Sequence, residues 1–248
     1  MSAARGGRLV ALVGAWFDGH ARLAADDVPH GAAGTRERKR IDLARQLPFV
    51  AIHTGCLLAP WVGFSVTAAL VAAALYAVRM FAITAFYHRY FAHRAFRTGR
   101  VAQFLFAVVG AAAAQRGPLW WASHHRHHHV HADRPEDSHS ALQHGFLWSH
   151  AGWFMTRQNF ATKSELVASF ARFPELRFLD RWDALVPLAL AVLLYVAGAL
   201  AERHAPALGT SGAQLAVWGF CISTVALYHA TFSINSLAHR FEIGRAHV

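Results

Sequence analysis

The sequence contains few charged residues and few cysteines. Only 15% of its 248 residues are Asp, Glu, Lys or Arg, whereas a typical soluble domain has about 25%. Its two cysteines, Cys56 and Cys221, lie in apolar stretches, so the chain has neither a disulfide framework nor a cysteine-based zinc motif. These absences exclude an ordinary soluble domain and a small disulfide-rich secreted protein.

Acidic residues are also scarce: 14 Asp and Glu stand against 24 Lys and Arg, which gives a net charge of +10. An excess of basic residues can indicate nucleic-acid binding. Here, however, 55% of the residues are hydrophobic, and Lys and Arg beside membrane spans produce the same excess through the positive-inside rule. We therefore expect a multi-pass integral membrane protein that contacts membrane lipid and binds no nucleic acid.

Long apolar runs predict four transmembrane helices, near residues 49–64, 67–87, 184–203 and 213–232. The first two belong to one block, which is too long for a single span because about 20 residues cross a bilayer. The stretch PWVGFS at 60–65 supplies turn residues inside this block, so we expect a helical hairpin there. The apolar stretch 101–115 is shorter and predicts a buried or interfacial helix.

The positions of Arg and Lys set the expected orientation. Basic residues precede the first span and follow the second, whereas the loops on the other side carry almost none. By the positive-inside rule, both termini and the polar segment 88–183 should be cytoplasmic. Residues 1–40 are expected to form a flexible tail, followed by a membrane domain over 41–241.

A histidine-rich run, HHRHHHVHAD, occupies residues 124–133. His125, His128 and His129 are at positions i, i+3 and i+4, so they share one face of a helix. Three imidazoles arranged in this way make a metal site that needs little rearrangement. Taken alone, the run is equally compatible with a solvated basic stretch.

Two further clusters follow predicted spans: His88 and His93, and then Asn235 and His239. On an ideal helix His88 and His93 are about 140° apart, so they would hold different ions unless the helix ends between them. Each cluster alone is typical of a polar helix end at a membrane surface, but the predicted topology places all three on one side. Imidazole binds iron, zinc, copper and nickel, and many neutral histidines at the mouth of a helical bundle suit oxygen-activating iron.

At these residues the chain resembles the membrane fatty acyl desaturases of the stearoyl-CoA (delta-9) type. The similar stretches are HRYFAHRAF, HHRHHHVHADRPEDSHS, GFLWSHAGW and HATFSINSLAHRF, in the order and spacing of that family. The resemblance covers about residues 40–241. It implies an all-α membrane protein with four transmembrane helices and a cytosolic helical cap that holds a histidine-rich di-iron site.

The resemblance also implies a ligand set and a reaction. Two non-haem iron ions would be bound by His88, His93, His125, His128, His129, Asn235 and His239, with no catalytic residue beyond these ligands. The enzyme would use O₂ and electrons from a cytochrome b5 or ferredoxin-type donor to place a cis double bond in a fatty acyl-CoA. Acidic residues near the histidine run, Asp133, Glu136 and Asp137, are candidates to orient the imidazoles.

The sequence departs from the family at its end. The third family motif, His-x-x-His-His, does not follow His239. Residues 242–248, EIGRAHV, instead match one reading frame of a common sequencing adapter, so we interpret them as non-native read-through. We expect the natural gene to continue past Phe241, and we expect this chain, with its incomplete ligand set, to lack desaturase activity.

Two other functions are compatible with the histidines. A membrane di-iron hydroxylase or ketolase would use similar ligands, although the stretches NSLAH and GFLWSHAGW favour a desaturase. A histidine-rich metal transporter would need ionisable residues along its spans, and the predicted spans offer only His53, Arg79 and His229.

Overall fold

The structure is a computed structural model. It describes residues 14, 17–19, 41–43 and 45–238. Over these ranges the chain is almost entirely helical, as predicted, and its one β-type pairing is an isolated bridge between Ile41 and Thr156. Most of the predicted N-terminal tail, the ligand candidate His239 and the adapter-like residues 242–248 lie outside the described residues.

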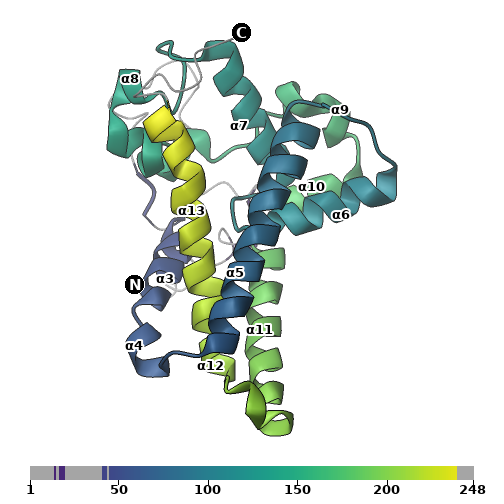
Figure 1. The fold of residues 1–248 in the computed structure, drawn as a ribbon. Coiled ribbons are helices and arrows are strands. Elements are labelled where there is room, and N and C mark those ends of the chain that lie inside the picture. Colours follow the sequence, from purple (N-terminus) through teal and green to yellow (C-terminus); the bar gives the residue numbers. More distant parts are fainter. Residues whose placement is uncertain (1–13, 15–16, 20–40, 44, 239–248) are drawn as a thin grey trace, which may run out of the picture.

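Within the described residues, three helices are long and apolar enough to cross a membrane, and they form the stem of the molecule (Figure 1). Their parts are α5 (Val66–Phe81) with the π-helix η1 (Ala82–Ala92); α11 (Leu185–His204); and α12 (Gly212–Gln214) with the π-helix η7 (Leu215–Ile222), α13 (Ser223–Ser233) and the π-helix η8 (Ile234–Ala238). They lie where the sequence predicts spans at 67–87, 184–203 and 213–232.

The first predicted span, 49–64, is not one long helix. The structure divides it into α3 (Leu47–Cys56) and α4 (Ala59–Val62). The ten residues of α3 rise by about 15 Å, half of the roughly 30 Å hydrocarbon core. Gly63, with a φ of +75°, ends α4 in a conformation that only glycine adopts readily, and the chain turns there toward α5.

Side chains of the third long helix hold this turn. Gln214 Nε2 donates to the carbonyl oxygen of Val62, and Trp218 Nε1 donates to that of Gly63, each over 3.1 Å. At the other end of α3, the rings of Phe49 and Phe232 lie 6.5 Å apart. Together α3 and α4 therefore lie along the same long helix, from near its start to near the end of α13.

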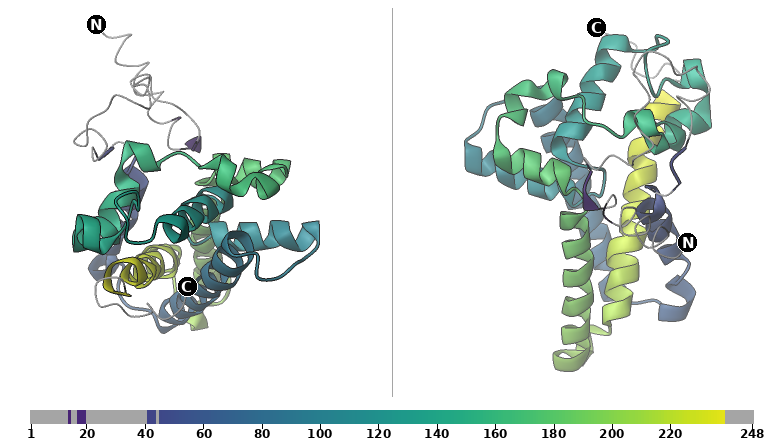
Figure 2. Two further views of the ribbon diagram at one scale, coloured as in Figure 1. Left: turned by 90° about the horizontal axis from the view of Figure 1, so that it is seen from above. Right: turned by 180° about the vertical axis from the view of Figure 1, so that it is seen from behind.

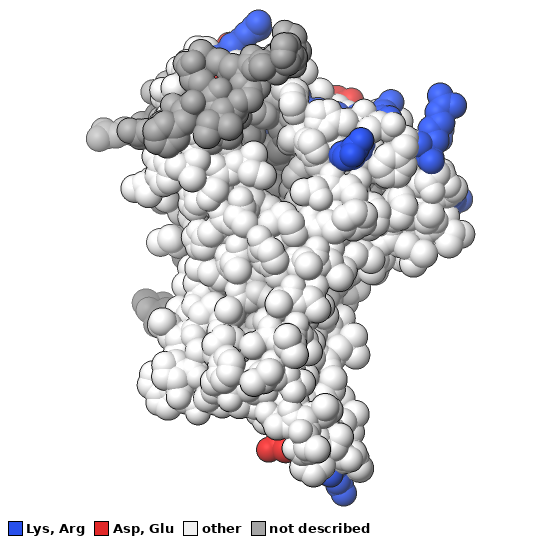
Figure 3. Space-filling view, viewed as in Figure 1, with Lys and Arg blue, Asp and Glu red and all other residues white. Residues whose placement is uncertain are grey.

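The stretch 101–115, predicted to form a buried or interfacial helix, contains α6 (Arg100–Ala111), a short apolar helix that runs sideways from the stem (Figures 1 and 2). Three large side chains on it, Val101, Phe104 and Leu105, are exposed. On the face shown in Figure 3, Lys and Arg gather at the upper end of the molecule, and the stem below is almost uncharged down to its tip. This distribution is typical of a stem in lipid beneath a polar end.

The remaining helices gather at the upper end of the stem (Figure 1). They are α7 (Pro118–His131), α8 (Ala141–His144), α9 (Ala168–Ala171) and α10 (Pro174–Arg181), with the short helices η2 (Trp148–Gly152), η3 (Trp153–Met155), η4 (Arg157–Asn159) and η5 (Ser164–Val167). A 3-10 turn, η6 (Pro206–Leu208), follows α11 at the opposite end. We call the helices at the upper end the cap. The main core lies where the cap meets the stem, and Tyr87, Phe91, Leu176 and Leu227 are fully buried there.

The helix that carries the histidine run, α7, is fixed at its first turn. Pro118 starts it, a position where the missing N–H costs nothing. The buried Asp180 carboxylate on α10 accepts the Trp120 N–H over 2.7 Å and the Thr162 hydroxyl over 2.7 Å. A Cβ added at Gly117 would lie 2.4 Å from Asp180 Cα, so glycine is needed for this close approach. The start of α7 is thus anchored to α10.

Candidate metal centre

Four histidines from two helices meet at the base of the cap. They are His88, His93, His125 and His129, whose ligand nitrogens all lie within 4.8 Å of one another. The Nε2 atom of His93 lies 3.0 Å from Nε2 of both His88 and His125, and Nε2 of His129 lies 3.0 Å from that of His125. The structure thus brings together four of the seven predicted ligands.

A π-helical turn is what brings His88 and His93 together. The α-helical period placed them about 140° apart, too far apart to hold one ion. In the structure they lie at the end of η1, where the His93 N–H donates to the His88 carbonyl over 3.0 Å. This i to i+5 bond stacks residues five apart on one face, and the two ring centroids are 4.4 Å apart.

The nitrogen positions fit a bound cation better than hydrogen bonds. Each Nε2 atom has either one hydrogen or one lone pair. His93 Nε2 and His125 Nε2 each contact two other Nε2 atoms, so each would have to use its single hydrogen or lone pair for two hydrogen bonds. Metal ligands at right angles, with bonds of about 2.1 Å, lie about 3.0 Å apart, which is the separation observed. The four imidazoles therefore suit one metal ion bound through Nε2.

The electrostatics of the cluster favour neutral imidazoles. Burial, followed by the neighbouring His88, lowers the pKa of His125 far below its usual range. Burial, followed by Arg126, lowers the pKa of His93. Protons therefore do not compete for these lone pairs at neutral pH. Trp121 lies flat against His125, with ring centroids 4.9 Å apart, and fixes the plane of that ring.

Arg126, inside the histidine run, joins the two helices of the site. Its guanidinium donates to the carbonyl oxygens of Phe91 and Leu166 over 2.6 Å each and to that of Ala92 over 2.8 Å. Phe91 and Ala92 are the last residues of η1, whose final carbonyls have no partner within the helix. This role of Arg126 is not predicted from the sequence, although a lone Arg among histidines is a visible signal.

His128 does not join the four-histidine cluster. It lies instead with Asp137 and His139 in a second, fully buried group of potential ligands. His128 Nδ1 donates to the Asp137 carboxylate over 2.9 Å, so Nε2 keeps its lone pair. Burial raises the pKa of Asp137, but the His128 hydrogen bond and the His139 charge outweigh it and lower the pKa to about 2.

Of the three acids considered as orienting groups, Asp137 contacts a predicted ligand. It also accepts the backbone N–H groups of Asp133 and His139, over 3.1 and 3.2 Å. The Asp133 carboxylate accepts the Ser140 hydroxyl over 3.0 Å. His139 was missed by sequence reasoning because it follows the helix, beyond a turn in which Asp133 has a φ of +59°.

The third predicted cluster is only partly described. Asn235 lies in η8, where its backbone carbonyl accepts the Ser149 hydroxyl of η2 over 3.0 Å. His239 lies outside the described residues. The described part of this cluster therefore packs against the GFLWSHAGW stretch.

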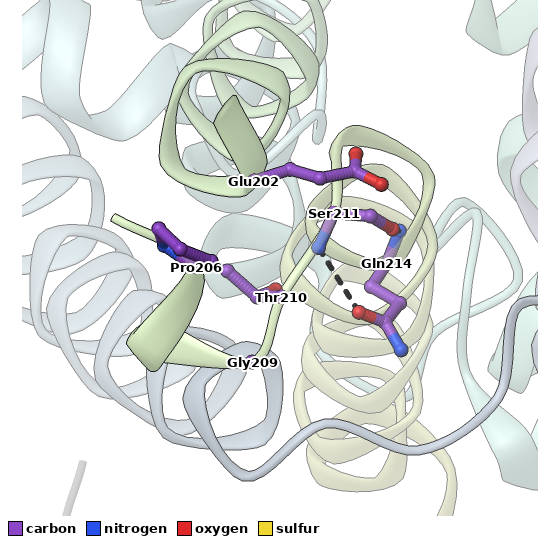
Figure 4. A pocket seen from close by; sticks show the side chains of 6 residues that line it. All are labelled: Glu202, Pro206, Gly209, Thr210, Ser211 and Gln214. Atoms are coloured by element: carbon purple, nitrogen blue, oxygen red, sulfur yellow. Dashed lines mark hydrogen bonds between the residues drawn. The ribbon is translucent and has the colours of Figure 1, made fainter. Parts of the chain in front are cut away.

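A pocket at the opposite end of the stem contains none of these histidines. Its lining is drawn in Figure 4 and consists of Glu202, Pro206, Gly209, Thr210, Ser211 and Gln214. Ser211 and Gln214 form a capping box, in which the Ser211 N–H donates to Gln214 Oε1 over 3.0 Å and the Gln214 N–H donates to Ser211 Oγ over 3.2 Å. These two groups cap the start of the third long helix, so they serve the fold.

Comparison with known proteins identifies the family. The chain matches the fatty acid desaturase family over residues 64–248. It is 32% identical over 214 residues to an sn-1 stearoyl-lipid 9-desaturase of Anabaena variabilis, covering 84% of this chain and 72% of that protein. It is 35% identical over 211 residues to the chloroplastic palmitoyl-monogalactosyldiacylglycerol delta-7 desaturase of Arabidopsis thaliana, covering 82% and 52%.

A third relative has a CoA-linked substrate in its name. The icosanoyl-CoA 5-desaturase of Limnanthes douglasii is 30% identical over 150 residues, covering 59% of this chain and 38% of that protein. The chain thus spans from about two fifths to about three quarters of the length of these relatives. The predicted resemblance is confirmed: the chain belongs to the fatty acid desaturase family, a family of membrane-bound oxidoreductases.

Proposed function

We propose that this protein is an O₂-dependent di-iron desaturase that introduces a cis double bond into a fatty acyl chain. The observation that carries the proposal is the convergence of four imidazole nitrogens from η1 and α7, in a chain whose relatives are named desaturases. Bound iron would activate O₂, with electrons from a cytochrome b5 or ferredoxin-type donor, for attack on unactivated methylene groups.

The seven proposed ligands divide between the two iron ions. His88, His93, His125 and His129 would hold one iron. His128 would hold the other, together with Asn235 and His239. Two observations support this division. The four nitrogens of the first group all lie within 4.8 Å of one another. The His128 hydrogen bond to Asp137 places the hydrogen of the neutral ring on Nδ1, so Nε2 has the lone pair that a metal ion requires.

We propose fatty acyl-CoA as the substrate, with lipid-linked acyl chains as the alternative that the experiment must separate. Two of the relatives described above are named for lipid-linked substrates and one for a CoA-linked substrate. Supplying the purified protein with stearoyl-CoA and, separately, with stearoyl-phospholipid in vesicles distinguishes them. An unsaturated product from the phospholipid alone would overturn the choice of acyl-CoA.

We also propose four membrane crossings, with the cap and both termini in the cytoplasm. The fourth crossing would be the α3–α4 pair, which lies along the third long helix between Gln214 and Phe232. Those residues are about 27 Å apart along a helix, close to the thickness of the hydrocarbon core. Labelling of single cysteines with an impermeant maleimide in intact cells tests the orientation. Ala207→Cys should react from outside, and Arg97→Cys only after permeabilisation; the reverse result would overturn the orientation.

The function is tested by iron content and product together, in protein expressed from the natural gene. The His125→Gln variant should lose iron and product, whereas His204→Gln, at an exposed position near the far end of α11, should keep both. Product analysis by mass spectrometry separates the alternatives, because a desaturase forms an alkene and a hydroxylase or ketolase adds oxygen. Iron-loaded wild-type protein that forms an oxygenated product, or equal iron in both variants, would contradict the proposal.

A further inference from the structure

Three more histidines, none of them in the two metal clusters, form a continuous chain of contacts. His53 lies on α3, His229 on α13 and His150 on η2. His53 Nε2 lies 3.4 Å from His229 Nε2, and His229 Nδ1 lies 3.0 Å from His150 Nε2. This chain of histidine contacts, called the histidine chain below, ends at the Phe49 carbonyl, 2.8 Å from His53 Nδ1, and at Ser236 Oγ, 3.0 Å from His150 Nδ1.

This arrangement does not suit a shared metal ion. The two nitrogens of His229 point to different rings, so the contacts run in a line and do not surround one point. Aromatic rings enclose the line: Phe232 lies against both His229 and His150, and Tyr228 is stacked near His53 at 6.0 Å. The Tyr228 hydroxyl donates to the Ala114 carbonyl over 2.7 Å, so this titratable group does not bond to the chain.

The terminal partners fix which nitrogens carry hydrogen in the neutral chain. A carbonyl oxygen only accepts, so His53 Nδ1 donates to Phe49 and His53 Nε2 has a lone pair. His229 must then donate through Nε2 and accept through Nδ1. His150 must likewise donate through Nε2, and its Nδ1 accepts the Ser236 hydroxyl. Every hydrogen bond of the neutral chain therefore points from Ser236 toward Phe49.

One further contact is left unmade in the neutral chain. Ser236 Oγ also lies 3.1 Å from the Phe232 carbonyl, but its single hydrogen is already used on His150. The five contacts thus share four hydrogens. One added proton supplies the fifth: His53 becomes an imidazolium, His229 and His150 then donate through Nδ1, and the Ser236 hydroxyl turns to Phe232.

The Ser236 end of the chain lies beside the proposed iron site. Ser236 follows Asn235, and the backbone carbonyl of Asn235 accepts the hydroxyl of Ser149, the residue before His150. A proton released from the chain at this end therefore leaves next to a proposed ligand of the second iron. The opposite end, at His53, lies on α3, outside both clusters.

We propose that His53, His229 and His150 form a proton-carrying chain that stores one proton and delivers it at the Ser236 end when O₂ is reduced. The inference rests on the proposed desaturase function. Forming one double bond from two methylenes consumes O₂, two electrons and two protons and yields two molecules of water. On delivery, His53 Nε2 passes its proton to His229 Nε2, His229 Nδ1 passes one to His150 Nε2, and His150 Nδ1 gives one up through Ser236.

Proton storage by the histidine chain is tested first, in a measurement that needs no catalytic turnover. In ¹⁵N-histidine NMR spectra of the protein, acidification should move the hydrogen from Nε2 to Nδ1 on both His229 and His150, and both rings should change at one common pH. Signals are assigned with His53→Gln and His150→Gln. A merely structural role predicts three rings that titrate separately with unchanged neutral tautomers, and that result would overturn the proposal.

The delivery role is tested by breaking the middle of the chain. His229→Phe keeps an aromatic ring but cannot carry a proton. With iron content unchanged, alkene formation should slow by about 100-fold, and its solvent deuterium isotope effect should rise because proton supply becomes limiting. The control is His204→Phe. A wild-type rate in His229→Phe would overturn proton delivery. If iron-loaded protein expressed from the natural gene forms no alkene, the desaturase proposal is refuted instead, and the NMR titration still decides whether the three histidines carry a proton.

Discussion

Removing the Asp180 carboxylate should loosen the start of the histidine helix. The side chain is 2% exposed and holds the Trp120 N–H and the Thr162 hydroxyl, each over 2.7 Å. Asp180→Ala leaves the Trp120 N–H in a buried position without its partner, which costs about 1–3 kcal/mol. The lost Thr162 bond and the small cavity bring our expectation to a total of about 3 kcal/mol.

The midpoint of thermal unfolding measures this loss. For a chain of this size each kcal/mol lowers the midpoint by about 2–4 °C, so Asp180→Ala should unfold about 6–12 °C below the wild type in detergent. Asp180→Asn keeps an acceptor oxygen for Trp120 and should recover at least half of the loss. Iron content should fall with the midpoint in the alanine variant, because α7 carries His125 and His129.

A matched control is available on the same helix. Glu175 of α10 forms an ion pair at the surface with the exposed Arg100, N to O 2.7 Å, and surface pairs contribute at most about 1 kcal/mol to stability. Glu175→Ala should lower the midpoint much less than Asp180→Ala and should leave the iron content unchanged. Equal midpoints for Asp180→Ala and Glu175→Ala would refute the reasoning, since the buried carboxylate would then not anchor α7.

Three further outcomes are expected. Gly198→Ala should lower the unfolding midpoint, because its Cβ would lie 2.4 Å from the Ser211 carbonyl oxygen; an unchanged midpoint would show that α11 and α12 separate freely. Arg79→Met should reduce the yield of folded protein by removing a buried guanidinium that joins two long helices, and Arg79→Lys should not restore it, because lysine lacks the planar fork of donors. In protein expressed from the natural gene, Asp137→Asn should lower the iron content toward one ion per molecule, because His128 loses its carboxylate partner; two tightly bound ions would contradict this.

Hydropathy was sufficient to predict three of the long helices, but it did not predict the structure of the first span, 49–64. PWVGFS correctly marked a turn, and Gly63 makes that turn. The sequence did not show that the helix breaks again at 57–58. The end of α4 is likewise held from a distance, because Gln214 and Trp218, about 150 positions away in the chain, donate to the carbonyl oxygens of Val62 and Gly63.

The histidines show where a helical period succeeds and fails. The i, i+4 spacing predicted that His125 and His129 meet, and they do. His128 and His129 are about 100° apart on the helix, enough for them to belong to different clusters. His88 and His93 meet only because η1 is a π-helix, and a π turn has no period that composition reveals.

Arg126 has a consequence for the order in which the protein matures. It ties the end of η1 to α7 through carbonyl oxygens alone, so the two halves of the four-histidine cluster are fastened without using any metal ligand. During synthesis the first half emerges well before the second, and it acquires its partner when residue 126 folds against it. A metal ion would therefore enter a site that is already assembled, and a shortage of metal would leave the fold intact.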